Sequence, residues 1–187
     1  MKLAVSIAAL IVMTGCAPSV SERVRTAGLA PTAKYPVVAE ASSTFAAYLY
    51  ALDEPVFGGV EGAGLQVRLL VLSSEPGWWS LRRVEAAPNG AVVHGSVAGQ
   101  RPFSYTVSAA SWAALQDTLD AVNVWSAPWQ NLIALDGRVM GLEIRDGERH
   151  RAVWLVNPDH PKNASFLRVY NALNMVGSLA DTGHARN

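Results

Sequence analysis

Two turn signals, Asn89-Gly90 and Asp146-Gly147, constrain the fold of this 187-residue chain more than any other feature. Each dipeptide separates two short runs that carry β-branched and aromatic residues, and this arrangement is typical of a β-hairpin with a two-residue turn. The runs joined by the two signals are residues 78–85 and 91–97, and residues 138–145 and 149–156. The sequence therefore predicts two antiparallel hairpins.

Two further runs extend the first hairpin. Residues 65–73 place apolar side chains at every second position from Val67 to Val71, which matches the two-residue period of a strand. Residues 103–107 follow the hairpin after a turn at 98–102. These runs bring the prediction to six strands, the first four of which form an antiparallel meander.

Three segments carry helical patterns. Ser108 is a predicted helix N-cap, and the helix after it ends near Asn123. Its apolar stripe consists of Trp112, Leu115, Leu119 and Val122. A second helix is predicted for residues 163–180, with Phe166, Val169, Tyr170, Leu173 and Val176 facing inward. Residues 37–52 are rich in alanine and favour a helix, although the alternation around Tyr48 and Tyr50 would also suit a strand.

Together these elements predict an α+β fold, an antiparallel sheet of about six strands with two or three helices packed on one face. A run of strands followed by a helix occurs twice, in residues 65–123 and in residues 138–180. This order fits a degenerate internal repeat. We favour the alternative interpretation, in which helices pack over one face of an antiparallel sheet, as is common in α+β proteins. The second face of such a sheet must be solvated or used for binding.

Composition supports one globular domain in residues 37–187. Half of all residues are apolar, six are tryptophan, and the formal net charge is zero. Nothing in this balance attracts nucleic acid. The four histidines (His94, His150, His160 and His184) lie at no metal-ligand spacing, so we expect neither a metal nor a cofactor.

The N-terminus combines three features in order. Lys2 supplies a positive charge, residues 3–12 are almost entirely apolar, and Met13-Thr14-Gly15-Cys16 places a small residue before the only cysteine. This segment resembles the signal peptide and lipobox of bacterial lipoproteins. The resemblance implies that cleavage between Gly15 and Cys16 removes residues 1–15, and that Cys16 then carries the acyl chains of a membrane anchor.

The same resemblance implies a location. The residue after the cysteine is Ala17 and not aspartate, which implies an outer-membrane lipoprotein that faces the periplasm. Residues 16–36 are small, polar and unpatterned, so we predict a flexible tether between the lipidated cysteine and the domain.

The body of the chain resembles a loose class of small uncharacterised bacterial envelope proteins. The matching segments are Ser111-Trp112-x-x-Leu115, Trp125-Ser126-x-Pro128, Leu135-Asp136-Gly137 and Gly141-Leu142-Glu143. The resemblance covers residues 108–180 at best, and it implies no activity.

The adjacent pair Trp78-Trp79 is the most unusual local feature. Neighbouring side chains on a strand face opposite sides, so one indole could form an exposed platform for a partner. The structural alternative, which we favour, buries both tryptophans, one under each layer. If a binding surface exists here, Arg82 and Arg83 are the charged residues that would join Trp78 or Trp79 in it.

The second hairpin is rich in charge. It contains carboxylates and His150 close together in the sequence, which could in principle support acid–base chemistry. The charged residues are Glu143, Arg145, Asp146, Glu148, Arg149, His150 and Arg151. We favour a solvated hairpin with weak surface ion pairs, and we assign no catalytic residue.

These observations predict a lipid-anchored, non-enzymatic binding or assembly module that meets an envelope protein through a free sheet face or a strand edge. One alternative is an inhibitor or immunity protein against a periplasmic toxin or hydrolase. Another is an envelope hydrolase with dispersed catalytic residues. A concave pocket that gathers His94 or His150 with a carboxylate would favour the hydrolase, and a smooth surface would count against it.

Overall fold

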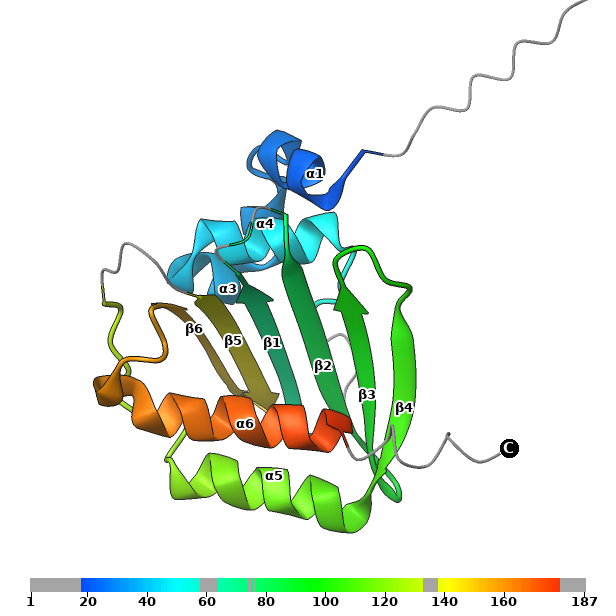
Figure 1. The fold of residues 1–187 in the computed structure, drawn as a ribbon, viewed down its shortest axis with the longest axis vertical. Coiled ribbons are helices and arrows are strands. Elements are labelled where there is room, and N and C mark those ends of the chain that lie inside the picture. Colours follow the sequence, from blue (N-terminus) through cyan, green and yellow to red (C-terminus); the bar gives the residue numbers. More distant parts are fainter. Residues whose placement is uncertain (1–17, 58–63, 74, 76, 133–137, 179–187) are drawn as a thin grey trace, which may run out of the picture.

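The computed structural model describes residues 18–57, 64–73, 75, 77–132 and 138–178. Six strands form one sheet in the order β4-β3-β2-β1-β5-β6, and all neighbouring strands are antiparallel. The strands are β1 (Gln66–Leu72), β2 (Trp79–Ala87), β3 (Gly90–Val97), β4 (Phe103–Ser108), β5 (Val139–Asp146) and β6 (Arg149–Val156). The predicted six-stranded antiparallel sheet is confirmed, including both hairpins (Figure 1).

In the described residues, four helices precede the first strand, one follows β4 and one follows β6. They are α1 (Val20–Thr26), α2 (Ala30–Lys34), α3 (Pro36–Ala41), α4 (Ser43–Ala51), α5 (Ala109–Ala121) and α6 (Ala164–Ser178), with a short 3₁₀ turn, η1, at Pro161–Asn163. The α+β class is confirmed, and the number of helices is higher than predicted because residues 20–41 are largely helical. No helix in these described ranges is long and apolar enough to cross a bilayer.

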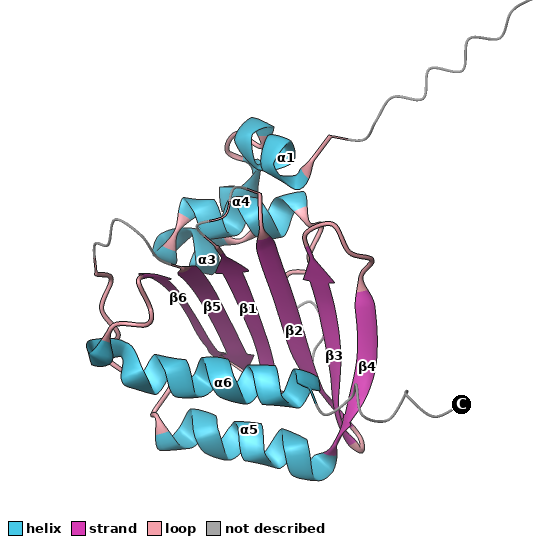
Figure 2. Cartoon of the chain, in the orientation of Figure 1, coloured by secondary structure: helices cyan, strands magenta, loops and turns pink. Residues whose placement is uncertain are grey.

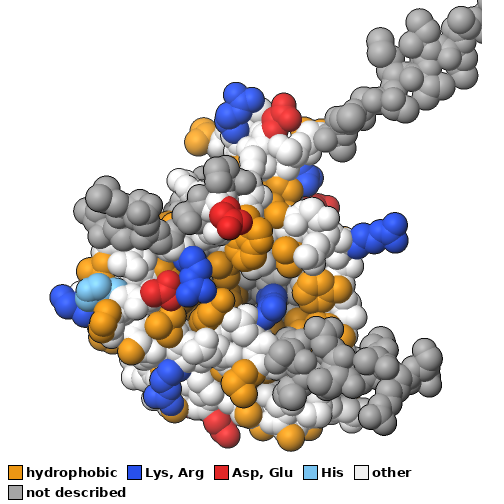
Figure 3. Space-filling model, viewed as in Figure 1, with side chains coloured by type: hydrophobic (Ala, Val, Ile, Leu, Met, Phe, Trp, Pro, Cys, Tyr) orange, Lys and Arg blue, Asp and Glu red, His pale blue; other side chains and the backbone are white. Residues whose placement is uncertain are grey.

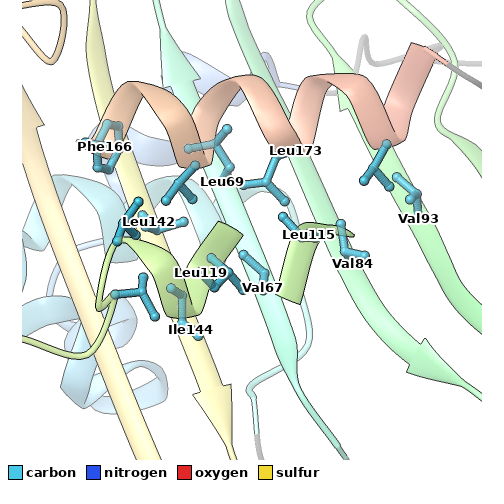
Figure 4. Close-up of a cluster of buried hydrophobic side chains, with 14 of the residues drawn as sticks. Val67, Leu69, Val84, Val93, Leu115, Leu119, Leu142, Ile144, Phe166 and Leu173 are labelled. Atoms are coloured by element: carbon cyan, nitrogen blue, oxygen red, sulfur yellow. The ribbon is translucent and has the colours of Figure 1, made fainter. Parts of the chain in front are cut away.

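Helices α5 and α6 cover one side of the sheet, which we call the first face (Figure 2). Ser108 caps α5 as predicted, since its hydroxyl accepts a hydrogen bond from the amide of Ser111 at 3.2 Å. The core beneath the two helices is apolar, as Figure 4 shows. It includes Val67, Leu69, Val84, Leu115, Leu119, Leu142, Ile144, Phe166 and Leu173.

The opposite side of the sheet, the second face, is also covered. Phe45 of α4 stacks on Trp154 of β6 with ring centroids 5.8 Å apart, and a Cβ added to Gly141 would come within 2.8 Å of the Phe45 ring. Leu70 and Leu81 complete this second core. The N-terminal helices therefore cover the part of the predicted free sheet face that surrounds Leu70 and Leu81.

The prediction of a flexible tether over residues 16–36 is wrong for most of that range. Residues 20–26 and 30–34 are helical, and Pro31 and Tyr35 are buried. The Tyr35 hydroxyl donates to the carbonyl oxygens of Leu49 and Glu54, which fastens the segment to α4 and to the residues that follow it. Cys16 and Gly15 lie outside the described residues.

Candidate functional site

The strand register divides the second face into an apolar half and a charged half. Opposed residues in an antiparallel pair point to the same side of the sheet. Arg68 is paired with Arg83 on one side and with Glu143 on the other, and it lies two positions from the apolar Leu70. We call the charged half the polar cluster; it comprises Gln66, Arg68, Arg83, Glu85, His94, Glu143, Arg145 and His150.

Arg68 occupies the centre of the polar cluster and is completely buried, with 0% exposure. Its Nη2 donates to the carbonyl oxygen of Pro55 at 2.6 Å, and its guanidinium carbon lies 4.1 Å from the ring centroid of Phe57. Its Nη1 lies 3.5 Å from Oε2 of Glu143. Burial lowers the pKa of Arg68 below its ordinary value, while Glu143 and Glu54 act in the opposite direction. Arg68 thus fixes the segment after α4 onto the sheet.

Glu143 is 1% exposed, so the prediction of a solvated second hairpin is wrong at this position. Its two oxygens have different partners, Oε2 facing Arg68 and Oε1 lying 2.9 Å from Nε2 of His150. The far end of the hairpin does match the prediction, because Asp146 and Arg149 form an ion pair at an exposed turn. The register explains the difference, since Glu143 lies on the second face beside Arg68.

Beside Arg68, a second group of charges surrounds Arg83. The Arg83 Nε lies 3.3 Å from Oε2 of Glu54, and its Nη1 donates to Oε1 of Glu85 at 2.5 Å. His94 follows on the next strand, with Nε2 3.7 Å from Oε2 of Glu85. Arg83 is thereby held between two carboxylates, one from the sheet and one from the segment after α4.

A pocket of about 390 Å³ opens beside this group, over β2, β3 and β4. It gathers a histidine, a carboxylate and a guanidinium with hydroxyl groups and apolar walls. Its lining includes Glu54, Leu81, Arg83, His94, Phe103 and Ser104. Ser104 lies directly opposite His94 in the β3–β4 register. We call this hollow the β3–β4 pocket, and we take it as the candidate site because it brings a histidine, a carboxylate and a guanidinium together.

The structure does not assemble the predicted surface of Trp78, Trp79, Arg82 and Arg83. Trp78 is 38% exposed and Trp79 is 8% exposed, so the favoured prediction that both are buried is wrong for Trp78. Arg82 and Arg83 point to opposite faces: Arg82 donates to Oδ1 of Asn174 on α6, and Arg83 faces the β3–β4 pocket. Only Arg83 among the four lines a candidate site.

Within the described ranges, no group of three or more His, Cys, Asp or Glu side chains could hold a metal ion. His150 pairs with Glu143, and His160 accepts a hydrogen bond from the amide of Lys162 at 3.2 Å. His184 lies outside the described residues.

Sequence reasoning missed the roles of Arg68 and Glu54. One signal in the sequence could have indicated a buried Arg68: it lies in a predicted strand between two apolar residues, Val67 and Leu69. An arginine buried in a sheet requires a carboxylate, but the sequence does not identify which of fifteen acidic residues supplies it. No protein-family model matches the chain, and no curated protein matches it either.

Proposed function

We propose that this protein is a lipid-anchored binding module of the bacterial envelope that holds an extended segment of a partner protein at the β3–β4 pocket. The order of features up to Cys16 supports the anchor. The observation that carries the binding role is the combination of this pocket with an adjoining strand at the edge of the sheet.

Strand β4 is the outermost strand on its side of the sheet, next to β3 alone. An extended peptide can add to such an edge through main-chain hydrogen bonds, while pockets beside the edge select its side chains. Ser104 and Thr106 of β4 are exposed and point to the same side as His94. A peptide added along β4 would therefore lie beside the pocket, and every second side chain of the peptide would point to the pocket's side of the sheet.

The pocket chemistry favours a polar side chain of the partner. Arg83 is already paired with Glu54 and Glu85, so a single added charge would disturb a balanced arrangement. A hydroxyl or amide group can instead use the carboxylate, the imidazole and the Ser104 hydroxyl without adding net charge. Leu81 and Leu52 provide the apolar walls around such a group.

Photo-crosslinking in the cells that make the protein tests the binding role. A photoreactive residue at Thr106 should form an adduct with one dominant protein, and the same residue at Glu148, an exposed position of the β5–β6 turn, should not. Ser104→Trp should abolish the adduct by filling the pocket. Equal labelling from Thr106 and Glu148, or an adduct unaffected by Ser104→Trp, would contradict a site at β4.

The anchor is tested separately. Mass spectrometry of the mature protein should find acyl chains on Cys16, and Cys16→Ser should move the protein from the membrane fraction to the soluble fraction. An inhibitor or immunity role would be one form of the same binding, and it is recognised when the crosslinked partner is a toxin or a hydrolase.

A hydrolase is the second candidate, favoured by the gathering of His94 with carboxylates in a concave pocket. In this case Ser104 would be the nucleophile and His94 the general base oriented by Glu85. A fluorophosphonate probe should then label Ser104, and His94→Ala should abolish the labelling. Absence of labelling in the folded protein would leave binding as the role of the pocket.

A further inference from the structure

Helices α1 and α2 form the end of the molecule nearest to the proposed anchor. Pro18, the first described residue, is two residues from Cys16, and α1 begins at Val20. A fully extended chain spans at most about 3.6 Å per residue, so Val20 lies within roughly 14 Å of the acylated residue. A tether this short holds α1 close to the lipid headgroups.

The two helices are fixed to the domain, so the rest of the molecule must follow them. Val20 packs against the second-face core, and Pro31 of α2 is buried. The Ser19 hydroxyl accepts a hydrogen bond from the amide of Glu22 at 3.2 Å, which caps α1. An anchor at Cys16 therefore restrains the orientation of the whole domain and not only its distance from the membrane.

This end of the molecule combines an exposed apolar tip with exposed basic residues. Leu29 is 85% exposed, more than any other large hydrophobic residue in the described ranges. It follows Gly28, whose φ of +59° allows the chain to turn sharply between α1 and α2. Arg23 and Arg25 are exposed on α1, which has Glu22 as its acidic residue. Figure 3 shows basic, acidic and hydrophobic side chains together at the α1 end.

We infer that the α1–α2 end of the molecule rests on anionic phospholipid, with Leu29 entering the lipid and with Arg23 and Arg25 reaching the headgroups from opposite sides of α1. This inference depends on the anchor proposed above. An exposed leucine can enter the boundary between headgroups and acyl chains, and neighbouring arginines are attracted to an anionic leaflet within the Debye length. The formal net charge of the whole chain is zero, so the attraction arises from the local excess on α1.

The inferred contact orients the binding site. Helix α1 lies at one end of the molecule, whereas the C-terminal end of β5 lies at the other (Figure 1). With α1 on the membrane, the β5–β6 turn points away from the lipid. The N-terminal helices then lie between the membrane and the sheet, and a partner can reach β4 without being blocked by the membrane.

Site-specific fluorescence on the anchored protein tests the contact. The only cysteine of the chain is Cys16, so an acylated protein with Ala30→Cys carries one reactive thiol, next to Leu29. The probe is an environment-sensitive dye on this thiol, in vesicles of phosphatidylethanolamine and phosphatidylglycerol. We expect a blue-shifted emission, quenching by a lipid-borne quencher and protection from a soluble quencher. A dye at Glu148→Cys should show the aqueous pattern.

Two variants separate the contributions. Leu29→Ser in the Ala30→Cys background should return the dye to water in all vesicles. Arg23→Glu/Arg25→Glu should do so in anionic vesicles, and the parent protein should lose the contact when phosphatidylglycerol is omitted. An aqueous dye at Ala30→Cys in a protein with confirmed acylation of Cys16 would overturn the inference and leave the anchor intact. Absence of acylation would instead contradict the proposed anchor.

Discussion

The first face of the sheet has apolar side chains at its centre, whereas the second face has a buried arginine at the equivalent depth. On β1, Val67 and Leu69 point under α5 and α6, and Arg68 between them points to the opposite side. Helices pack against both faces, although the β3–β4 pocket lies open on the second face. The faces also differ in what fills their interiors, because the first face relies on apolar packing and the second requires matched charges in the polar cluster.

This difference has an energetic consequence. A buried apolar side chain contributes through the area that it removes from water, and its loss leaves a cavity. A buried ion pair contributes little net stability when intact, but removing one partner leaves an uncompensated charge. The stability that the second face contributes therefore depends more on which charged residue is removed than on the number of contacts removed with it.

The largest expected effect is from Arg68→Met, which should destabilise the protein by roughly 3–5 kcal/mol because Glu143 and Glu54 lose their buried counter-charge. Urea unfolding measures it. Arg82→Met is the matched control on the neighbouring strand, and it should cost about 1 kcal/mol through the hydrogen bond to Asn174. Equal losses in the two variants would contradict the distinction between the faces.

The double variant Arg68→Met/Glu143→Leu sharpens the same comparison. It removes the charge that the single substitution leaves unpaired, and it should recover about half of the lost stability or more. Additive losses would show that Glu143 is supported by His150 and the surrounding backbone independently of Arg68.

On the first face, Leu142→Ala should cost about 3 kcal/mol in the free energy of unfolding. Leu142 is fully buried among Leu119, Ile144 and other residues of the first core, so truncation leaves a cavity and no unpaired charge. A second truncation, such as Leu115→Ala, should produce a similar loss. A loss below about 1 kcal/mol would indicate that α5 and α6 collapse readily onto the sheet.

Two glycines, one facing each side of the sheet, allow the same comparison. A Cβ at Gly141 would lie 2.8 Å from the Phe45 ring, which is fully buried, so Gly141→Ala should cost about 1–3 kcal/mol. A Cβ at Gly95 would lie 2.1 Å from the Phe103 ring, but Phe103 is only partly buried and lies on the edge strand. Gly95→Ala should therefore cost less, and a reversed order would show that β4 is the more rigid element.

The sequence predicted well those elements whose signals are local. Asn89-Gly90 and Asp146-Gly147 located both hairpins, and Ser108 located the start of α5, because each signal acts within a few residues. The short helices α1 and α2 were missed. Helices of this length have little intrinsic stability, and they form here because Pro31 and Tyr35 pack against the domain.

The candidate site was predicted less well than the fold, because its residues meet only through long-range pairing. His94 was recognised as a histidine on a strand, but its neighbours Glu54 and Arg83 come from other segments. Neighbouring side chains on one strand face opposite sides, so Arg82 and Arg83 could not share a surface on a regular strand. The predicted surface grouped residues by sequence proximity, whereas the sheet groups them by register.

The smallest expected effect concerns Tyr35, which joins the N-terminal helices to the second face. Tyr35→Phe should cost about 1 kcal/mol at neutral pH, because the carbonyl oxygens of Leu49 and Glu54 lose their common donor. Burial raises the pKa of Tyr35 above its ordinary 10.0, although Lys34 and Arg68 oppose the shift. The folded state therefore retains a proton that the unfolded state releases, and this contribution is lost as the pH rises beyond 10.0.

The stability difference between the parent protein and Tyr35→Phe should accordingly shrink in urea unfolding at alkaline pH. Tyr48→Phe provides the control. Burial also raises the pKa of Tyr48, but its hydroxyl makes no hydrogen bond within the described ranges. Tyr48→Phe should therefore leave stability at neutral pH nearly unchanged while reducing the alkaline loss. If Tyr35→Phe behaves in the same way as Tyr48→Phe at neutral pH, the two carbonyl contacts contribute little, and packing alone fastens α1 and α2 to the domain.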